Sequence, residues 1–260
     1  MTHLLRSKGW IVALAVACLT VAGCEQKKGP GEYYLHGAQW ITEDENDQAI
    51  SNLTQIIHDQ PDNVGAYVKR AEIKARLGRY EDALADLDQA IRLQPDNPEI
   101  FQRRSDIQAQ FGQSDAAISD MNHVIRMRPH DDFALLKRAL LSFEADRYHA
   151  AIIDLDKFIV ARPDHESAYV LRGLCRSRMH QFQLAIADYN QALRLTPNSP
   201  HIFVSRAVAK HVLGQIDESI ADFETALHLL NSSSRYAAHR YDQRRASIAR
   251  WIQWMIEENQ

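Results

Sequence analysis

The chain has 260 residues with 30 basic and 34 acidic side chains, which give a formal net charge of −4. Residues 1–23 hold two basic side chains and no acidic one, so the remaining chain has a charge of −6. This charge argues against a nucleic-acid-binding protein. The length allows one or two domains or a single array of repeats.

Residues 1–23 have the pattern of an export signal. Arg6 and Lys8 precede an uncharged stretch that runs from Gly9 to Cys24. With about 15 apolar residues, this stretch is shorter than the roughly 20 residues that a membrane-spanning helix needs. The pattern therefore favours a cleaved signal peptide over an uncleaved anchor.

Two cleavage positions fit the end of this signal. Residues 15–17 (Ala-Val-Ala) follow the small-x-small rule of ordinary secretion, but they leave only residues 10–14 as the apolar segment. Residues 21–24 (Val-Ala-Gly-Cys) resemble the lipobox of bacterial lipoproteins. This resemblance implies a lipidated Cys24, followed by a short linker over residues 24–29. Two or more acyl chains would hold the protein stably on a membrane.

From residue 30 the sequence repeats with a period of 34 residues. The period is marked by five prolines: Pro61, Pro95, Pro129, Pro163 and Pro197. The other three prolines share one phase of it: Pro30, Pro98 and Pro200. The phases define six repeats, at 30–63, 64–97, 98–131, 132–165, 166–199 and 200–233. A period of 34 residues is typical of tetratricopeptide repeats, each of which is a pair of helices.

Three positions of the repeat keep their residue size. Position 4 is large in every repeat: Tyr33, Tyr67, Phe101, Leu135, Tyr169 and Phe203. Position 8 is small: Gly37, Ala71, Ser105, Ala139, Gly173 and Ala207. Position 20 is small as well: Ala49, Ala83, Ala117, Ala151, Ala185 and Ser219. These residues resemble the tetratricopeptide family. The resemblance implies an all-α, right-handed superhelical solenoid of six helix hairpins, in which the proline at position 32 ends each second helix.

Positions 7 and 23 depart together from the commonest pattern of the family. Position 7 is arginine in five repeats: Arg70, Arg104, Arg138, Arg172 and Arg206. Position 23 is aspartate in the same five: Asp86, Asp120, Asp154, Asp188 and Asp222. Repeat one changes both, to His36 and Asn52. The joint change predicts that the two positions touch, as partly buried ion pairs that hold the structure together. The alternative is a row of arginines that binds an acidic ligand.

The two ends of the array differ from its middle. Repeat one has Thr-Glu-Asp-Glu-Asn-Asp at residues 42–47, where we expect an acidic turn between its two helices. Residues 234–260 follow the last repeat, and we expect a capping helix there from about Arg235 to Glu258. Five arginines of this segment could contact anionic lipid or an acidic partner, or could simply face solvent.

The family resemblance also implies that the first helices line a concave binding surface. In repeats one to three that surface is mostly polar, with residues such as Glu72, Arg76 and Asp106. In repeats four to six it is apolar: Phe133, Leu136, Leu140, Phe143, Val170, Leu174, Val204 and Val208. We expect these side chains to bind a helical or extended segment of a partner. They could instead pack against neighbouring first helices or the capping helix.

No pattern of catalytic residues stands out. The histidines are scattered, and the sequence has none of the common metal, redox, hydrolase or phosphate-binding motifs. His201 and His211 could both face the groove, but an ordinary polar lining explains them. Cys175 is expected to be a small buried residue. Once Cys18 is removed and Cys24 is lipidated, no other cysteine remains with which Cys175 could form a disulfide within the chain. The family's lysine and asparagine carboxylate clamp is also missing. We therefore expect no enzyme, cofactor, metal or small-molecule substrate.

Together these features resemble bacterial envelope tetratricopeptide lipoproteins of the NlpI or pilotin type. The resemblance implies a lipid-anchored scaffold that faces the periplasm and binds other envelope proteins, at the outer membrane more than at the inner one. A pilotin-like assembly factor for a secretin or a type IV pilus is the alternative. An enzyme is a third possibility, which the absence of catalytic motifs disfavours.

Overall fold

The computed structural model describes residues 33–34, 40–41, 43–232, 248–250, 253 and 257. These residues belong to two compact units that divide between Arg147 and Tyr148. We call residues 33–147 the N-terminal unit and residues 148–257 the C-terminal unit. The expected signal peptide, Cys24 and the linker over 24–29 lie outside the described residues.

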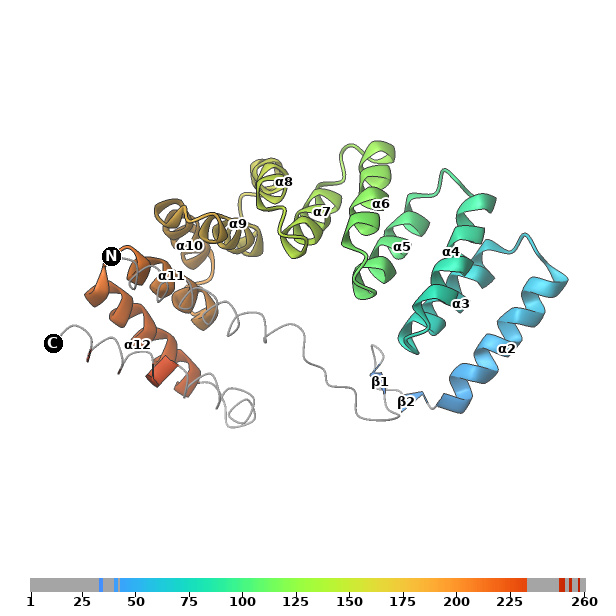
Figure 1. The fold of residues 1–260 in the computed structure, drawn as a ribbon, viewed down its shortest axis with the longest axis horizontal. Helices are drawn as coiled ribbons and strands as arrows, with labels where there is room; N and C mark the ends of the chain where they lie inside the picture. Colours follow the sequence, from blue (N-terminus) through green and yellow to red (C-terminus); the bar gives the residue numbers. More distant parts are fainter. Residues whose placement is uncertain are drawn as a thin grey trace, which may run out of the picture. The chain divides into compact units, whose positions relative to one another are not determined.

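The N-terminal unit begins with a short ribbon and continues as six helices (Figure 1). They are β1 (Tyr33–Tyr34), β2 (Trp40–Ile41), α2 (Glu43–Asp59), α3 (Val64–Arg76), α4 (Tyr80–Leu93), α5 (Pro98–Gln110), α6 (Ser114–Met127) and α7 (Asp132–Glu144). The C-terminal unit contains α8 (Tyr148–Ala161), α9 (Glu166–Arg178), α10 (Phe182–Leu195), α11 (Pro200–Val212) and α12 (Ile216–Ser232). Within each unit, consecutive helices pack against one another, which confirms the predicted all-α class of stacked hairpins.

The repeat's own residues set the helix ends. Every described second helix except α12 stops two residues before a proline; α4, for example, ends at Leu93, two residues before Pro95. The next helix begins after a polar cap: the Asn63 side chain accepts a hydrogen bond from the backbone N–H of Ala66 at 3.1 Å. The proline and the cap together fix where one repeat ends and the next one starts.

The turn inside each hairpin needs a left-handed residue at repeat position 15. This residue has a positive φ in all five described turns between a first and a second helix: Gly78, Gly112, Asp146, His180 and Gly214. Glycine adopts this conformation without a steric penalty, whereas Asp146 (φ 57°) and His180 (φ 59°) adopt it at some cost. The turn geometry is therefore the same in every hairpin although the residue differs.

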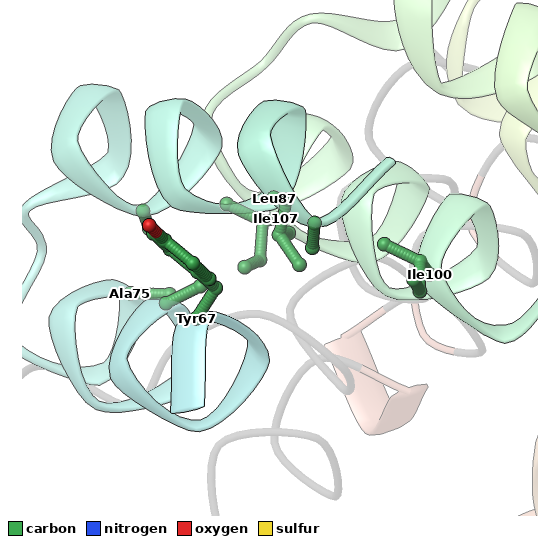
Figure 2. Packing of buried hydrophobic residues seen from close by; sticks show 8 residues of the cluster. Tyr67, Ala75, Leu87, Ile100 and Ile107 are labelled. Carbon is green, nitrogen blue, oxygen red and sulfur yellow. The ribbon is translucent and has the colours of Figure 1, made fainter. Parts of the chain in front are cut away.

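The small residues at positions 8 and 20 are buried between the two helices of a hairpin. Ala71 and Ala83 are fully buried there in repeat two. In repeat three the Ser105 hydroxyl donates to the carbonyl of Ala117 across the hairpin, at 2.9 Å. Figure 2 shows buried side chains from three helices packed in one cluster: Tyr67 and Ala75 from α3, Leu87 from α4, and Ile100 and Ile107 from α5.

In its described residues, repeat one differs from the expected hairpin. Its second helix is present as α2, but the described residues of its first half pair as an antiparallel ribbon, with Tyr33 opposite Ile41. The acidic segment expected as a turn is instead the first turns of α2, which begins at Glu43. Carboxylates are favourable at a helix N-terminus, and aromatic and β-branched residues favour strands. Within the two units, the described residues thus form four helix hairpins, α3–α4, α5–α6, α9–α10 and α11–α12, together with the single helices α2, α7 and α8.

The expected capping helix is described only in part. Residues 248–250, 253 and 257 are helical, and Ile248 is buried against Phe223, Ala226 and Leu230 of α12. The rest of residues 234–260, including the arginines Arg235, Arg240, Arg244 and Arg245, lies outside the described residues. None of the helices described here combines the length and apolar character needed to cross a bilayer.

Candidate protein-binding surface

The structure brings four of the five arginine–aspartate pairs together. Arg104 donates to both carboxylate oxygens of Asp120, at 2.7 Å from Nε and 2.6 Å from Nη2. Three further pairs have related geometry: Arg70 with Asp86, Arg172 with Asp188, and Arg206 with Asp222. The residues of the fifth pair, Arg138 and Asp154, belong to different compact units. The paired arginines are not available as a free row of cations.

Each of these arginines also reaches the preceding repeat, a contact that the sequence analysis missed. The Nη1 group of Arg104 donates to Asp88 at 2.6 Å, so this guanidinium bridges α4 and α6. The acceptor is always the residue at repeat position 25: Thr54, Asp88, Asn122, Asp156 and Asn190. Every repeat has a polar side chain at this position, a pattern that an exposed helix face would show as well. The arginine therefore links neighbouring repeats as well as the two helices of its own hairpin.

Further cations and aromatic rings complete this arrangement. At position 11, Lys74, Arg176 and Lys210 give the same aspartates a second cation, whereas repeats three and four have Gln108 and Ser142. The position-4 ring lies under the arginine, with the Arg206 guanidinium carbon 5.3 Å from the centre of the Phe203 ring. Hydrogen bonding to Asp120 raises the pKa of Arg104, and hydrogen bonding to Asp86 raises that of Arg70.

The polar first-helix residues of the N-terminal unit are largely paired with one another. Glu72 on α3 accepts a hydrogen bond from Arg103 on α5, and Asp106 on α5 lies 2.5 Å from the ammonium nitrogen of Lys137 on α7. These pairs join repeat positions 9 and 6 of adjacent repeats. Their carboxylates therefore contribute to helix stacking and present little net charge to a ligand.

Helix α7 presents the most exposed apolar residues of the expected groove. Phe133 is 51% exposed and Leu140 is 46% exposed, and because they are seven residues apart they lie on one face of the helix. Leu136 and Phe143 from the same helix are half-buried. Most large apolar side chains of the N-terminal unit are in the core, so this face is the part of the expected groove that a partner can reach there.

The groove residues of the C-terminal unit are less accessible. Val204 and Val208 on α11 pack against the cluster that contains Phe223 and Ile248. This position agrees with the alternative in which such residues pack against the capping segment. Val170 and Leu174 on α9 are half-buried. The eight predicted residues are thus divided between two units, with the strongest exposure on α7.

The residues singled out for possible chemistry have ordinary surroundings. His201 is exposed, and its Nδ1 lies 2.9 Å from the hydroxyl of Ser199, the residue that precedes α11. Cys175 is fully buried, and this burial raises the pKa of its thiol to about 12. Within the described residues, no three His, Cys, Asp or Glu side chains are placed to bind a metal ion together.

Two segments of the chain match models of the tetratricopeptide repeat, over residues 41–110 and 166–199. The chain therefore contains tetratricopeptide repeats, which generally mediate protein–protein interactions. Scaffolds of this family are generally not enzymes, and neither match indicates a catalytic family. No curated protein has a sequence that matches this chain.

Solved structures with a similar fold include MamA and YrrB. A crystal structure of MamA is 20% identical, with a TM-score of 0.61, over 68% of this chain and 97% of MamA. MamA from Desulfovibrio magneticus RS-1 is also 20% identical, with a TM-score of 0.62, over 66% of this chain and 97% of its own. YrrB, described as a tetratricopeptide protein with an unusual peptide-binding site, is 13% identical, with a TM-score of 0.57, over 74% of this chain and 99% of its own. At these identities the likeness is one of fold.

Proposed function

We propose that this protein is a lipid-anchored scaffold that binds a partner protein of the bacterial envelope through apolar side chains of its first helices. The observation that carries the binding proposal is the exposed apolar face of α7, formed by Phe133 and Leu140. A short helical or extended segment of a partner could cover this face. Val170 and Leu174 on α9 offer a second, half-buried contact in the C-terminal unit.

The charges around α7 favour an apolar partner segment over an acidic one. Arg104 on α5 is paired with Asp120, and Lys137 on α7 is paired with Asp106. Binding would therefore depend mainly on the apolar area that is removed from water. An interface of this kind is expected to be little affected by salt, in contrast to one made of exposed charges.

Substitution of the apolar residues tests the binding proposal. We expect Phe133→Asp and Leu136→Asp to abolish capture of the partner from detergent-solubilised membranes, and Val170→Asp to weaken it. Ala85→Asp, on the exposed side of α4, introduces the same charge elsewhere and should leave capture unchanged. Circular dichroism checks that helicity is retained, and Phe133→Asp is the safest variant because its site is half exposed. Unchanged capture by folded Phe133→Asp and Leu136→Asp proteins would refute the proposal.

The proposed anchor is Cys24, which ends the lipobox-like sequence. Intact mass of the membrane-extracted protein should show a chain that begins at an acylated Cys24. The Cys24→Ser variant should lack this species and leave the membrane fraction. A free N-terminus at Cys18 would instead mean ordinary secretion, and the anchor would be refuted while the binding proposal would stand.

The partner's identity decides between two forms of the scaffold. An adaptor would recover soluble envelope enzymes such as proteases or peptidoglycan hydrolases. An assembly factor of the pilotin type would recover a secretin or a pilus component. Cross-linking in the intact envelope, followed by mass spectrometry, distinguishes the two. Hydrolysis of peptidoglycan or peptides by the purified protein alone would contradict both.

A further inference from the structure

The outer faces of the second helices reveal one repeat that differs from the others. Repeat position 22 is small in five repeats: Ser51, Ala85, Ser119, Ala187 and Ala221. Position 29 is basic in the same five: His58, Arg92, Arg126, Arg194 and His228. In α8 these two positions hold Ile153 and Val160. Among the second helices, α8 therefore has large apolar side chains at two outer positions where the others have a small and a basic residue.

These two side chains point into solvent. Ile153 is 57% exposed and Val160 is 85% exposed, more than any other large apolar side chain in the described residues. Because they are seven residues apart, they lie on one stripe of α8. Single exposed apolar residues are common, but two on one stripe, at positions where the sister helices are small and basic, indicate a contact surface. Leu184, 50% exposed on the next second helix, adds apolar surface to the same unit.

The stripe is complementary to itself when it is read in the opposite direction. Between the two apolar residues lie an acidic and a basic one, Asp156 and Lys157, and both are exposed. In an antiparallel pair of α8 helices with a twofold axis between residues 156 and 157, Ile153 meets Val160 of the second copy. Asp156 then meets Lys157 of the second copy, and symmetry makes each contact twice.

The four side chains are accessible for these contacts. Asp156 accepts a hydrogen bond from Arg172 at 2.7 Å through Oδ1, and its side chain is still 52% exposed. Arg172 in turn bonds Asp188 on α10, which fixes the position of Asp156 on the surface. We propose that α8 is the contact helix of a symmetric homodimer of this protein. A second copy fits because the order apolar, acidic, basic, apolar is its own complement.

Sedimentation velocity of the purified full chain in detergent tests the dimer. We expect a dimer for the unaltered protein, and a rise of at least about tenfold in its dissociation constant for Ile153→Ala/Val160→Arg. This double variant gives α8 the outer residues of α10, Ala187 and Arg194. Ile56→Ala, on an exposed apolar residue of α2, is the matched control and should leave the dimer intact. A monomer at about 100 μM, or a double variant that dimerises as tightly as the unaltered protein, would overturn the proposal.

Disulfide cross-linking tests the antiparallel arrangement. In a Cys18→Ser/Cys24→Ser background, the remaining Cys175 is buried. A mixture of Ile153→Cys and Val160→Cys chains should form disulfide dimers that contain one of each. Either variant alone should not, because residues with the same number would be about 10 Å apart along the paired helices, too far for a disulfide. Equal cross-linking of either variant with itself, or no cross-linking in the mixture, would overturn the antiparallel pairing.

Discussion

Gly173 and Tyr189 fit together because residue 173 has no side chain. A β-carbon at Gly173 would lie 2.6 Å from Cε1 of Tyr189, closer than real β-carbons come to other atoms. Tyr189 is fully buried, and its hydroxyl lies 3.2 Å from that of Ser177. Repeat five therefore combines the largest residue at position 24 with the smallest at position 8.

This fit predicts that Gly173→Ala destabilises the protein by about 1–3 kcal/mol, because the ring must move within a packed core. Adding Tyr189→Leu should recover part of the loss, since repeat two already combines Ala71 with Leu87 at these positions. Urea unfolding of the two single variants and the double variant measures the coupling. Additive losses would show that the two residues do not constrain each other.

The positive φ shared by the turns predicts that two substitutions at repeat position 15 change stability in opposite directions. Gly112→Ala forces a β-carbon into a φ of +79° and should lower stability by about 1 kcal/mol, although no atom is near enough to clash. His180→Gly relieves the same strain at a φ of 59° and should be neutral or raise stability by up to about 1 kcal/mol. Thermal unfolding of both variants checks the signs. A stabilising Gly112→Ala would contradict the turn geometry.

The arginine–aspartate pairs predict that two neighbouring arginines contribute very different amounts to the free energy of unfolding. Arg104→Leu leaves the buried carboxylate of Asp120 without its guanidinium and should cost roughly 3–5 kcal/mol. Arg103→Leu removes only an exposed pair with Glu72 and should cost less than about 1 kcal/mol. The double variant Arg104→Leu/Asp120→Leu should be more stable than Arg104→Leu alone. The midpoints of urea unfolding rank the stabilities of these variants. Equal losses of stability for Arg104→Leu and Arg103→Leu would contradict the structural role of the arginine–aspartate pairs.

Burial of Cys175 predicts a loss of stability in alkaline solution. The pKa of its thiol is raised to about 12 by burial, while an unfolded thiol titrates near about 8.5. Above about pH 8.5 the unfolded chain loses its proton first, so the free energy of unfolding falls by up to about 1.4 kcal/mol per pH unit. Cys175→Ala should lack this part of the pH dependence. Rapid alkylation of Cys175 in the folded protein at pH 8.5 would contradict the burial.

The repeat period made most of the fold predictable. Constant residue size at positions 4, 8 and 20, with prolines at position 32, indicated helix pairs because each position has one packing role in every hairpin. The pairing of positions 7 and 23 could be inferred from their joint change at His36 and Asn52. Position 25 was missed because a polar residue on a second helix, such as Asn122, is indistinguishable in sequence from a solvated one.

The structure of repeat one and the accessibility of the groove residues could not be predicted from the repeat period. Repeat one keeps the spacing of the family, but the strand-forming residues Trp40 and Ile41 and the acidic segment after them override it. The accessibility of the groove also could not be predicted. Phe133 and Val204 are both apolar first-helix residues, but Phe133 is 51% exposed, whereas Val204 packs against the cluster that includes Ile248 in its own unit.

Site-specific photocross-linking in the envelope tests the proposed binding function most directly. A photoreactive amino acid at Phe133 or Leu140 on α7 should form adducts with another protein, and Leu136→Asp in the same chain should remove them. The same group at Ala85, on the exposed side of α4, should give no such adduct. Absence of adducts from both α7 positions, or the same adducts from Ala85, would contradict a scaffold that binds its partner through this face.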